Sequence, residues 1–400
     1  MHSKPVVTRV MLLLTIMVVG LNLRPFMTSV GPLAASIQAD TGLGLQGLAL
    51  LTLLPMFVMG LLAFSSSVFQ GKGWDRRAVV SALLLICLGC VWRLFVSTSA
   101  ALIATAAVIG LGVAVVQIIF PGMVKREFPR HVGPVMGLYS ALLMGGGAMG
   151  AVVAPMVYDA TGSWTAGLAC FALPAALAVC LSGLFLPPDR VAPNGPVRLP
   201  IGVLLKRPRT WLLMLCFGLV NGGYSSAVAW LAPAFQARGW SAASSGELLA
   251  VLAVGQALAA LLLPMLARTG VDRRPWMGLT LALQVIGFMG LAAWPDLIPM
   301  VWVVLLGVGL GGCFAFFLIL ALEHLPDPVQ AGMLAALMQG GGFMLAAMAP
   351  WWVAVLHEGT GSYLAGWLWH LGCALLVMCL SWRLGPGGYA RAIGLPGVAR

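Results

Sequence analysis

One stretch decides how this chain folds: Leu21-Asn22-Leu23-Arg24-Pro25-Phe26-Met27-Thr28. It places an arginine inside an apolar run that extends over residues 10–33, with no carboxylate within a helical turn. An arginine at the centre of a bilayer costs about 2.5–3.5 kcal/mol on insertion scales. We therefore expect Arg24 to face an interior cavity of a helical bundle, where water or an anion can solvate its guanidinium.

The composition indicates that lipid is the solvent. Of the 400 residues, 61% are hydrophobic and only 8% are charged, and the mean hydropathy is +1.01. Soluble domains carry roughly a quarter charged residues. The net charge of +11 comes from short basic clusters at the ends of apolar runs, without a basic face on which bases could stack, which argues against nucleic acid as a partner.

Twelve apolar stretches reach the roughly 20 residues that a membrane-spanning helix needs. They cover residues 10–35, 47–70, 78–97, 101–124, 134–157, 164–186, 210–233, 244–267, 276–294, 297–322, 331–354 and 364–384. Lys4 and Arg9 before the first run imitate a signal peptide. The run continues without a clear small-residue cleavage site, so we expect a retained first span. The predicted fold class is an all-α membrane protein.

Basic residues alternate between the two sides of these spans. Of the 22 Lys and Arg residues, 19 fall on one side: Lys4, Arg9, Lys72, Arg76, Arg77, Lys125, Arg126, Arg130, Arg190, Arg198, Lys206, Arg207, Arg209, Arg268, Arg273, Arg274, Arg383, Arg391 and Arg400. Loops rich in Lys and Arg stay in the cytoplasm. The pattern predicts a multi-pass protein of a bacterial inner membrane with both termini cytoplasmic.

The two halves of the chain repeat each other. Gly137, the triplet Gly145-Gly146-Gly147 and Pro155 recur at identical spacing as Gly332, Gly340-Gly341-Gly342 and Pro350. Internal repeats of this kind are typical of transporters. The repeat predicts two pseudosymmetric six-helix bundles, residues 1–186 and 210–400, joined by a Pro-rich cytoplasmic linker over residues 187–209.

Four motifs carry a resemblance to a known family: Leu23-Arg24-Pro25 with Gly31-Pro32-Leu33, Leu51-Thr52-Leu53-Leu54-Pro55, Arg93 after the third span, and Phe120-Pro121-Gly122-x-x-Lys125-Arg126-x-Phe128-Pro129. With the duplicated bundle, they make the chain resemble the major facilitator superfamily, and within it the cyanate porter and 2-nitroimidazole exporter family. The resemblance implies alternating access by two rocking halves around a central site.

The chain departs from the superfamily in the loop after the second span. The usual Gly-x-x-x-Asp-Arg-x-Gly-Arg-Arg is replaced by residues 66–77, with Gln70 where the aspartate would stand. This puts a charge-relay latch at the loop in doubt. Arg76 and Arg77 stay candidates for gating, through pairing with carboxylates such as Glu127 or Asp75.

Polar residues inside the spans are the candidate substrate ligands. Arg24 shares a helical face with Gly20, Thr28 and Gly31, because residues four and seven apart lie on one side of a helix. The substrate-binding candidates are Arg24, Asn22, Thr28, Gln117, Asn221, Tyr224 and Gln339. The alternative for each polar side chain is a structural hydrogen bond between helices. For Arg93, snorkelling to the interface is the favoured interpretation.

No carboxylate lies at the middle of a predicted span, so the sequence leaves the coupling mechanism open. Glu323 and His370 are candidates for gating or coupling, although His370 also fits a structural core histidine. No metal cluster, cofactor motif or catalytic triad is recognisable. The eight cysteines all lie in apolar segments and fit packing roles.

These patterns predict a transporter and not an enzyme. Its expected partners are the lipid bilayer and a small anionic or polar organic solute, with protons left open and a monomer expected. The family resemblance implies that the solute is cyanate-like or nitroimidazole-like. The alternative is a multidrug exporter of hydrophobic compounds in which Arg24 is structural.

Overall fold

The computed structural model describes residues 6–64, 74–128, 132–189, 201–267, 272–325 and 328–389, and all regular structure in these ranges is helical. The elements are α1 (Val6–Leu21), α2 (Pro25–Thr28), α3 (Ala34–Thr41), α4 (Leu45–Phe64), α6 (Asp75–Trp92), η1 (Arg93–Phe95), α7 (Ser99–Glu127), α8 (Val132–Thr161), α9 (Trp164–Ala169), α10 (Ala172–Phe185), α11 (Ile201–Leu205), α12 (Pro208–Gln236), α13 (Ala242–Leu266), α14 (Arg274–Ala293), α15 (Pro299–Glu323), α16 (Pro328–Thr360), α17 (Leu364–Ser381) and η3 (Pro386–Gly388).

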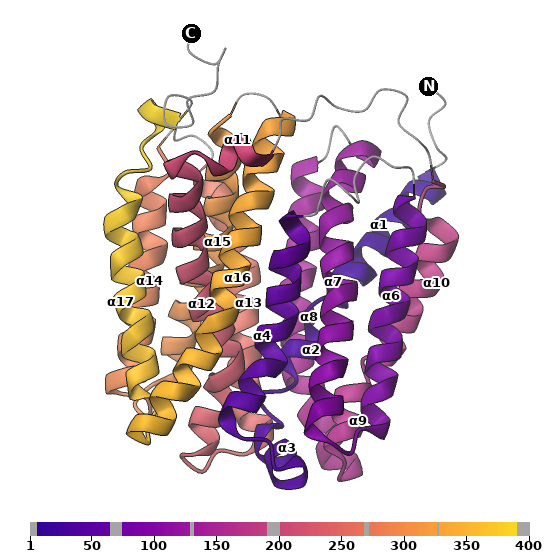
Figure 1. Ribbon diagram of the computed structural model, residues 1–400, viewed down its shortest axis with the longest axis vertical. Coiled ribbons are helices and arrows are strands. Elements are labelled where there is room, and N and C mark those ends of the chain that lie inside the picture. The colour runs from indigo at the N-terminus through magenta and orange to yellow at the C-terminus, as the bar shows by residue number, and fades with distance from the viewer. Residues whose placement is uncertain are drawn as a thin grey trace.

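Twelve helical segments in these described ranges are long and apolar enough to cross a membrane, which confirms the spans expected from hydropathy. A helix satisfies its own backbone hydrogen bonds, so it is the form that a single apolar segment takes in lipid. Helices α1–α10 gather on one side of the molecule and α12–α17 on the other, and α1 begins at the end of the bundle where α17 ends (Figure 1). The predicted boundaries at residues 186 and 210 stay predictions.

Parts of the sequence interpretation lie outside the described residues. These are the latch loop over residues 65–73, the middle of the predicted linker over residues 190–200, and the basic residues Lys4, Arg130, Arg268, Arg391 and Arg400.

The first span is broken at the stretch that contains the arginine. Helix α1 ends at Leu21, and the one-turn α2 begins at Pro25. Proline has no N–H to donate, and it disfavours the helical conformation of the residue before it. Arg24 accordingly takes φ −126° and ψ −24°, outside the helix, and becomes the N-cap of α2.

Glycines of α8 let the break between α1 and α2 lie close to α8. A Cβ added at Gly146 would collide with the Leu21 carbonyl, and one at Gly150 would lie 2.6 Å from the Pro25 Cα. Small residues four apart allow the backbones of membrane helices to approach closely. The equivalent triplet in the second half packs α16 on α12, where a Cβ on Gly341 would lie 2.7 Å from the Met214 sulfur.

The halves touch each other at the end of the bundle that contains α3. The Gln236 side-chain nitrogen of α12 donates to the Pro32 carbonyl at 2.8 Å, and Gln46 of α4 donates to the Glu358 carboxylate at 2.6 Å. A Cβ on Gly31 would lie 2.9 Å from the Val228 carbonyl. These contacts close the space between the halves at that end.

Candidate substrate site

A small cavity lies between the two groups of helices, and side chains from both line it. The lining residues are Arg24 after α1, Met144 of α8, Val220, Asn221 and Tyr224 of α12, Gln256 of α13, and Leu310 and Phe314 of α15. Measured with a water-sized sphere, its volume is about 20 Å³. One water needs roughly 10–15 Å³ by this measure, so the cavity accommodates a guest of very few atoms.

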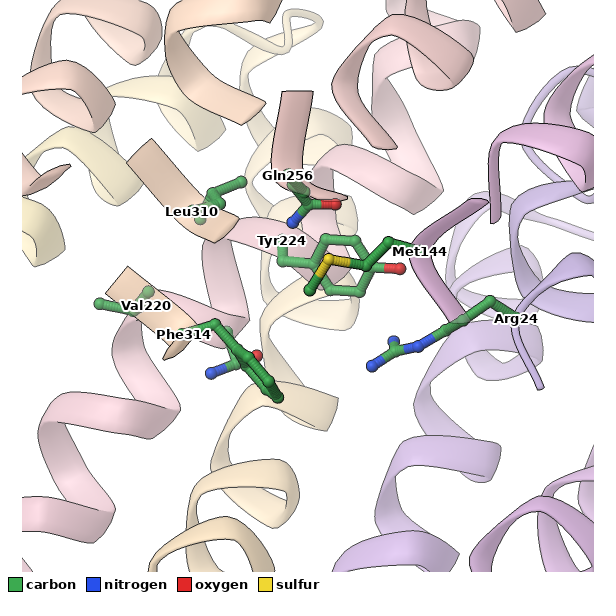
Figure 2. Close-up of a pocket in the computed structure, with 8 residues that line it drawn as sticks. Arg24, Met144, Val220, Tyr224, Gln256, Leu310 and Phe314 are labelled. Atoms are coloured by element: carbon green, nitrogen blue, oxygen red, sulfur yellow. The ribbon is translucent and has the colours of Figure 1, made fainter. Parts of the chain in front are cut away.

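Arg24 supplies the only formal charge among the eight lining residues. Its side chain reaches from the first half of the chain towards Tyr224 and Phe314 of the second (Figure 2). The guanidinium carbon lies 5.0 Å from the centroid of the Tyr224 ring, which is a cation–π contact. The prediction that Arg24 faces an interior cavity agrees with this geometry.

The Arg24 guanidinium is buried without full compensation. Only 5% of the residue is exposed, and within the described part of the chain Nε and Nη1 have no hydrogen-bond partner. A buried charge without hydrogen bonds is costly, and a carboxylate or other anion beside it removes most of that cost. A negatively charged guest beside this guanidinium would reduce that cost.

Asn221 and Tyr224 lie one helical turn apart on α12, and both line the cavity as the sequence predicted. The Asn221 amide nitrogen donates to the Phe217 carbonyl at 2.8 Å, which fixes the side chain along its own helix. Gln256, which is 5% exposed, adds a second amide that the sequence interpretation did not select. The signal in the sequence that could have identified Gln256 is its amide near the middle of an apolar span.

Two predicted ligands occupy other places, because the first span is not a continuous helix. Asn22 donates to the Val18 carbonyl at 2.8 Å and to the Pro174 carbonyl of α10 at 3.1 Å, away from the cavity. Thr28 donates to the carbonyls of Arg24 and Pro25, and its hydroxyl lies beside Gly150. The structure thus corrects the cavity-lining placement of Asn22 and Thr28: both hold the backbone around the break.

The remaining predicted ligands are not among the cavity residues. Gln117 of α7 and Gln339 of α16 are half-buried, and Gln339 makes a long 3.4 Å bond to the Ala335 carbonyl. A substrate role for either stays a prediction.

The position of Arg93 differs from the one expected from the sequence. The sequence favoured a side chain that snorkels to the membrane interface, yet the residue is completely buried. Its guanidinium donates through Nε to the Thr105 hydroxyl and through Nη1 to the Phe26 carbonyl, each at 3.2 Å. Arg93 directly follows α6 as the first residue of the short η1.

The predicted gating arginines contact a carboxylate that the sequence interpretation did not name. The Arg76 backbone N–H donates to Asp189 at 2.8 Å, its guanidinium donates to the Gly183 carbonyl, and Arg77 lies 3.3 Å from Asp189. Asp189 thereby places a negative charge at the N-terminus of α6, where the helix dipole favours it.

Glu323 and His370 lie apart from the cavity. Glu323 pairs with Arg273 at 2.8 Å, at the end of α15. His370 is buried on α17 with its ring stacked 5.4 Å from that of Phe288, and neither ring nitrogen has a partner in the described part of the chain. On the opposite side of α12 from the cavity, Gly222 and Gly223 make room for this ring.

Comparison with known proteins agrees with this architecture. Residues 12–350 match the Major Facilitator Superfamily. The chain is 41% identical to the cyanate transport protein CynX of Escherichia coli over 94% of this chain and 97% of that protein. It is 27% identical to the 2-nitroimidazole transporter of the same species, over 89% of this chain and 90% of that protein.

Solved structures support the same fold. A bacterial homologue of the human lysosomal transporter Spinster, in an inward-facing and occupied conformation, superimposes with a TM-score of 0.76 at 14% identity, over 99% of this chain and 100% of that one. A D-xylose–proton symporter gives 0.72 at 14% identity, over 94% and 98%.

Twelve spans around a cavity lined from both halves define a multi-pass membrane transporter of small molecules. The chain belongs to the Major Facilitator Superfamily.

Proposed function

We propose that this protein carries a small monovalent anion such as cyanate across the bacterial inner membrane by alternating access, with Arg24 as its principal ligand. One observation carries the proposal: a buried guanidinium, two of whose nitrogens have no partner in the described ranges, lines a cavity between the halves. The 41% identity to a cyanate transport protein over nearly the whole chain supports the same substrate class.

The geometry fits a linear ion of three atoms. A guanidinium offers five N–H donors in a plane, and it keeps its charge at every physiological pH. Beside it, Tyr224 and Phe314 present apolar ring faces, while Asn221 and Gln256 contribute amides. Cyanate, with charge at both ends and a thin profile, can contact the guanidinium without needing a second cation.

The arrangement of the halves supports the proposal of alternating access. In the conformation described, Gln236 and Pro32 join the halves at the α3 end. We propose that these contacts separate when the halves rock and that both termini face the cytoplasm. The cavity residues include no Asp, Glu or His. We therefore propose no proton transfer by the side chains of the cavity.

A planar nitroimidazole-like compound is the second candidate. Tyr224 and Phe314 could stack on a heterocycle, and the 2-nitroimidazole transporter is 27% identical to this chain. The volume of about 20 Å³ ranks it behind a triatomic anion. A multidrug exporter, in which Arg24 would be structural, ranks lower because two nitrogens of that guanidinium have no hydrogen-bond partner among the described residues.

The test is transport by the purified protein in proteoliposomes, with labelled cyanate outside and with thiocyanate, acetate or 2-nitroimidazole as competitors. We expect cyanate uptake that thiocyanate inhibits most and that Arg24→Gln strongly reduces. Arg238→Gln is the matched control, since Arg238 pairs with Asp296 at 2.6 Å on the surface. Uptake by Arg24→Gln at the wild-type rate, or inhibition by 2-nitroimidazole alone, would overturn the proposal.

A further inference from the structure

A second buried arginine lies behind the first, at a carbonyl that the helix break has left without its usual partner. In a continuous helix the Val30 N–H would donate to the Phe26 carbonyl. Here the Val30 N–H bonds to the Met27 carbonyl at 3.3 Å, and the Ser29 N–H bonds to the Pro25 carbonyl at 3.0 Å. The Phe26 carbonyl instead accepts a hydrogen bond from Arg93 Nη1 at 3.2 Å.

Arg93 is held firmly enough to act as a fixed donor. It is fully buried, and its Nε donates to the Thr105 hydroxyl, which itself donates to the Leu102 carbonyl at 2.7 Å. This series of hydrogen bonds thus joins α7, η1 and the backbone of α2. A hydrogen bond from a charged donor is worth more than one between neutral groups, so this contact restrains the broken segment strongly.

The restrained carbonyl lies two residues after Arg24. Helix α2 has a single turn, in which the backbone N–H groups of Met27 and Thr28 donate to the Arg24 carbonyl. Such a short turn has little stability of its own. The direction in which the Arg24 side chain leaves the break therefore depends on contacts outside α2, with α8 glycines on one side and Arg93 on another.

We propose that Arg93 is a positioning residue for the anion site: by holding the Phe26 carbonyl, it fixes α2 and so aims the Arg24 guanidinium into the cavity. This inference rests on the proposed function, because it assigns Arg93 an effect on anion affinity that acts through Arg24. Arg93 is not among the cavity residues and does not itself contact the ion.

A double-mutant cycle tests the proposal, with the dissociation constant for sodium cyanate measured by titration of purified, folded protein in detergent. We expect Arg93→Gln to weaken binding about tenfold, which corresponds to about 1.4 kcal/mol. In an Arg24→Gln background the same change should have no further effect. Arg93→Lys, which keeps a charged donor, should recover part of the affinity. Cys90→Ala, a buried change one turn away, should bind as the wild type does.

The possible failures are distinct. If Arg93→Gln binds cyanate normally, or weakens binding equally in both backgrounds, the positioning role is wrong while the Arg24 site stands. If Arg24→Gln binds normally, the proposed function and this inference both fall. Should Arg93→Gln not fold, Thr105→Val removes one anchor of the guanidinium. It should then weaken binding about threefold in the wild-type background alone, and unchanged affinity would overturn the proposal.

Discussion

At the scale of single residues, the site depends on a charge that the protein leaves partly uncompensated. The Arg24 guanidinium has an aromatic ring 5.0 Å away and two unpartnered nitrogens within the described part of the chain. Attraction to the face of a ring replaces only part of the solvation that burial removes. We propose that the site binds an anion for this reason, because an anion beside the guanidinium supplies the missing compensation.

The Tyr224 ring should matter through its face and not through its hydroxyl. Tyr224→Phe keeps an aromatic face under the guanidinium, so cyanate affinity should stay within about twofold of the wild type. Tyr224→Leu removes the face, and a desolvated cation–π contact is worth about 2 kcal/mol, so affinity should change by more than tenfold. Titration of both variants checks this; equal affinities for Phe and Leu would contradict the cation–π assignment.

At the scale of elements, the break between α1 and α2 decides which side chains meet the cavity. Sequence reasoning located Arg24, Asn221 and Tyr224, because a polar side chain in an apolar span has few other places to go. It misplaced Thr28, since the assumption of an unbroken helix put Thr28 on the face of Arg24. Pro25 interrupts the helix between Arg24 and Thr28, so the two side chains no longer share a face. Contacts with α8 fix their new arrangement.

The glycines of α8 should be required where they touch the break and dispensable elsewhere. Gly150→Ala would place a Cβ 2.6 Å from Pro25 backbone atoms, which cannot move aside as a flexible side chain could. We expect a loss of roughly 1–3 kcal/mol in stability, together with weaker cyanate binding. Gly145→Ala is the matched control, because its Cβ would meet nothing within 4 Å. Melting temperatures and cyanate titrations compare the two, and equal behaviour would argue against the close approach.

The end of α15 should give the protein an acid-sensitive contact. Burial, together with a smaller effect of the nearby Arg209 cation, lowers the pKa of His324 to about 4, although a hydrogen bond to the Leu320 carbonyl opposes the change. The His324 ring stacks on Tyr389 with 4.3 Å between centroids. In the unfolded chain the pKa is about 6.5, so the unfolded state binds the proton more tightly.

This contribution to stability is present above pH 6.5 and is lost as the pH falls towards 4. The free energy of unfolding should therefore be about 2 kcal/mol lower at pH 5 than at pH 7. His324→Phe keeps a ring to stack on Tyr389 but cannot titrate. Its melting temperature should therefore fall less than that of the wild type between pH 7 and pH 5. An identical fall in both proteins would show that other groups cause the acid sensitivity.

At the scale of the whole molecule, the two groups of spans lie side by side (Figure 1). They pack through α4 on α16 and α8 on α13, they also meet at the α3 end, and a small cavity lies between them. Hydropathy alone predicted the twelve spans, because membrane thickness fixes helix length. It could not predict the partners of Arg93 or Asp189. Those contacts depend on how helices distant in sequence pack, and neither charge nor spacing along the chain encodes that packing.

Loosening the contact at the α3 end should expose residues that are now buried. Gln236 bonds to the Pro32 carbonyl and the Ser245 hydroxyl, each at 2.8 Å, so Gln236→Ala removes one link between the halves and one within the second. In a cysteine-free background, Val228→Cys, which lies beside Gly31 of the first half and is now buried, should react faster with a polar thiol reagent when this change is present. Gln284→Ala, which removes a bond to Gly309 within the second half, is the control and should leave the rate unchanged.

The most direct test of the central claim is the position of a bound anion. A crystal structure with selenocyanate, an anion of the same shape whose selenium scatters anomalously, would locate it without reference to transport. We predict one anomalous peak in the cavity, with the anion within hydrogen-bond distance of the Arg24 guanidinium and beside Tyr224. A structure of the active protein with no peak there, or with selenium only at surface arginines, would contradict the account.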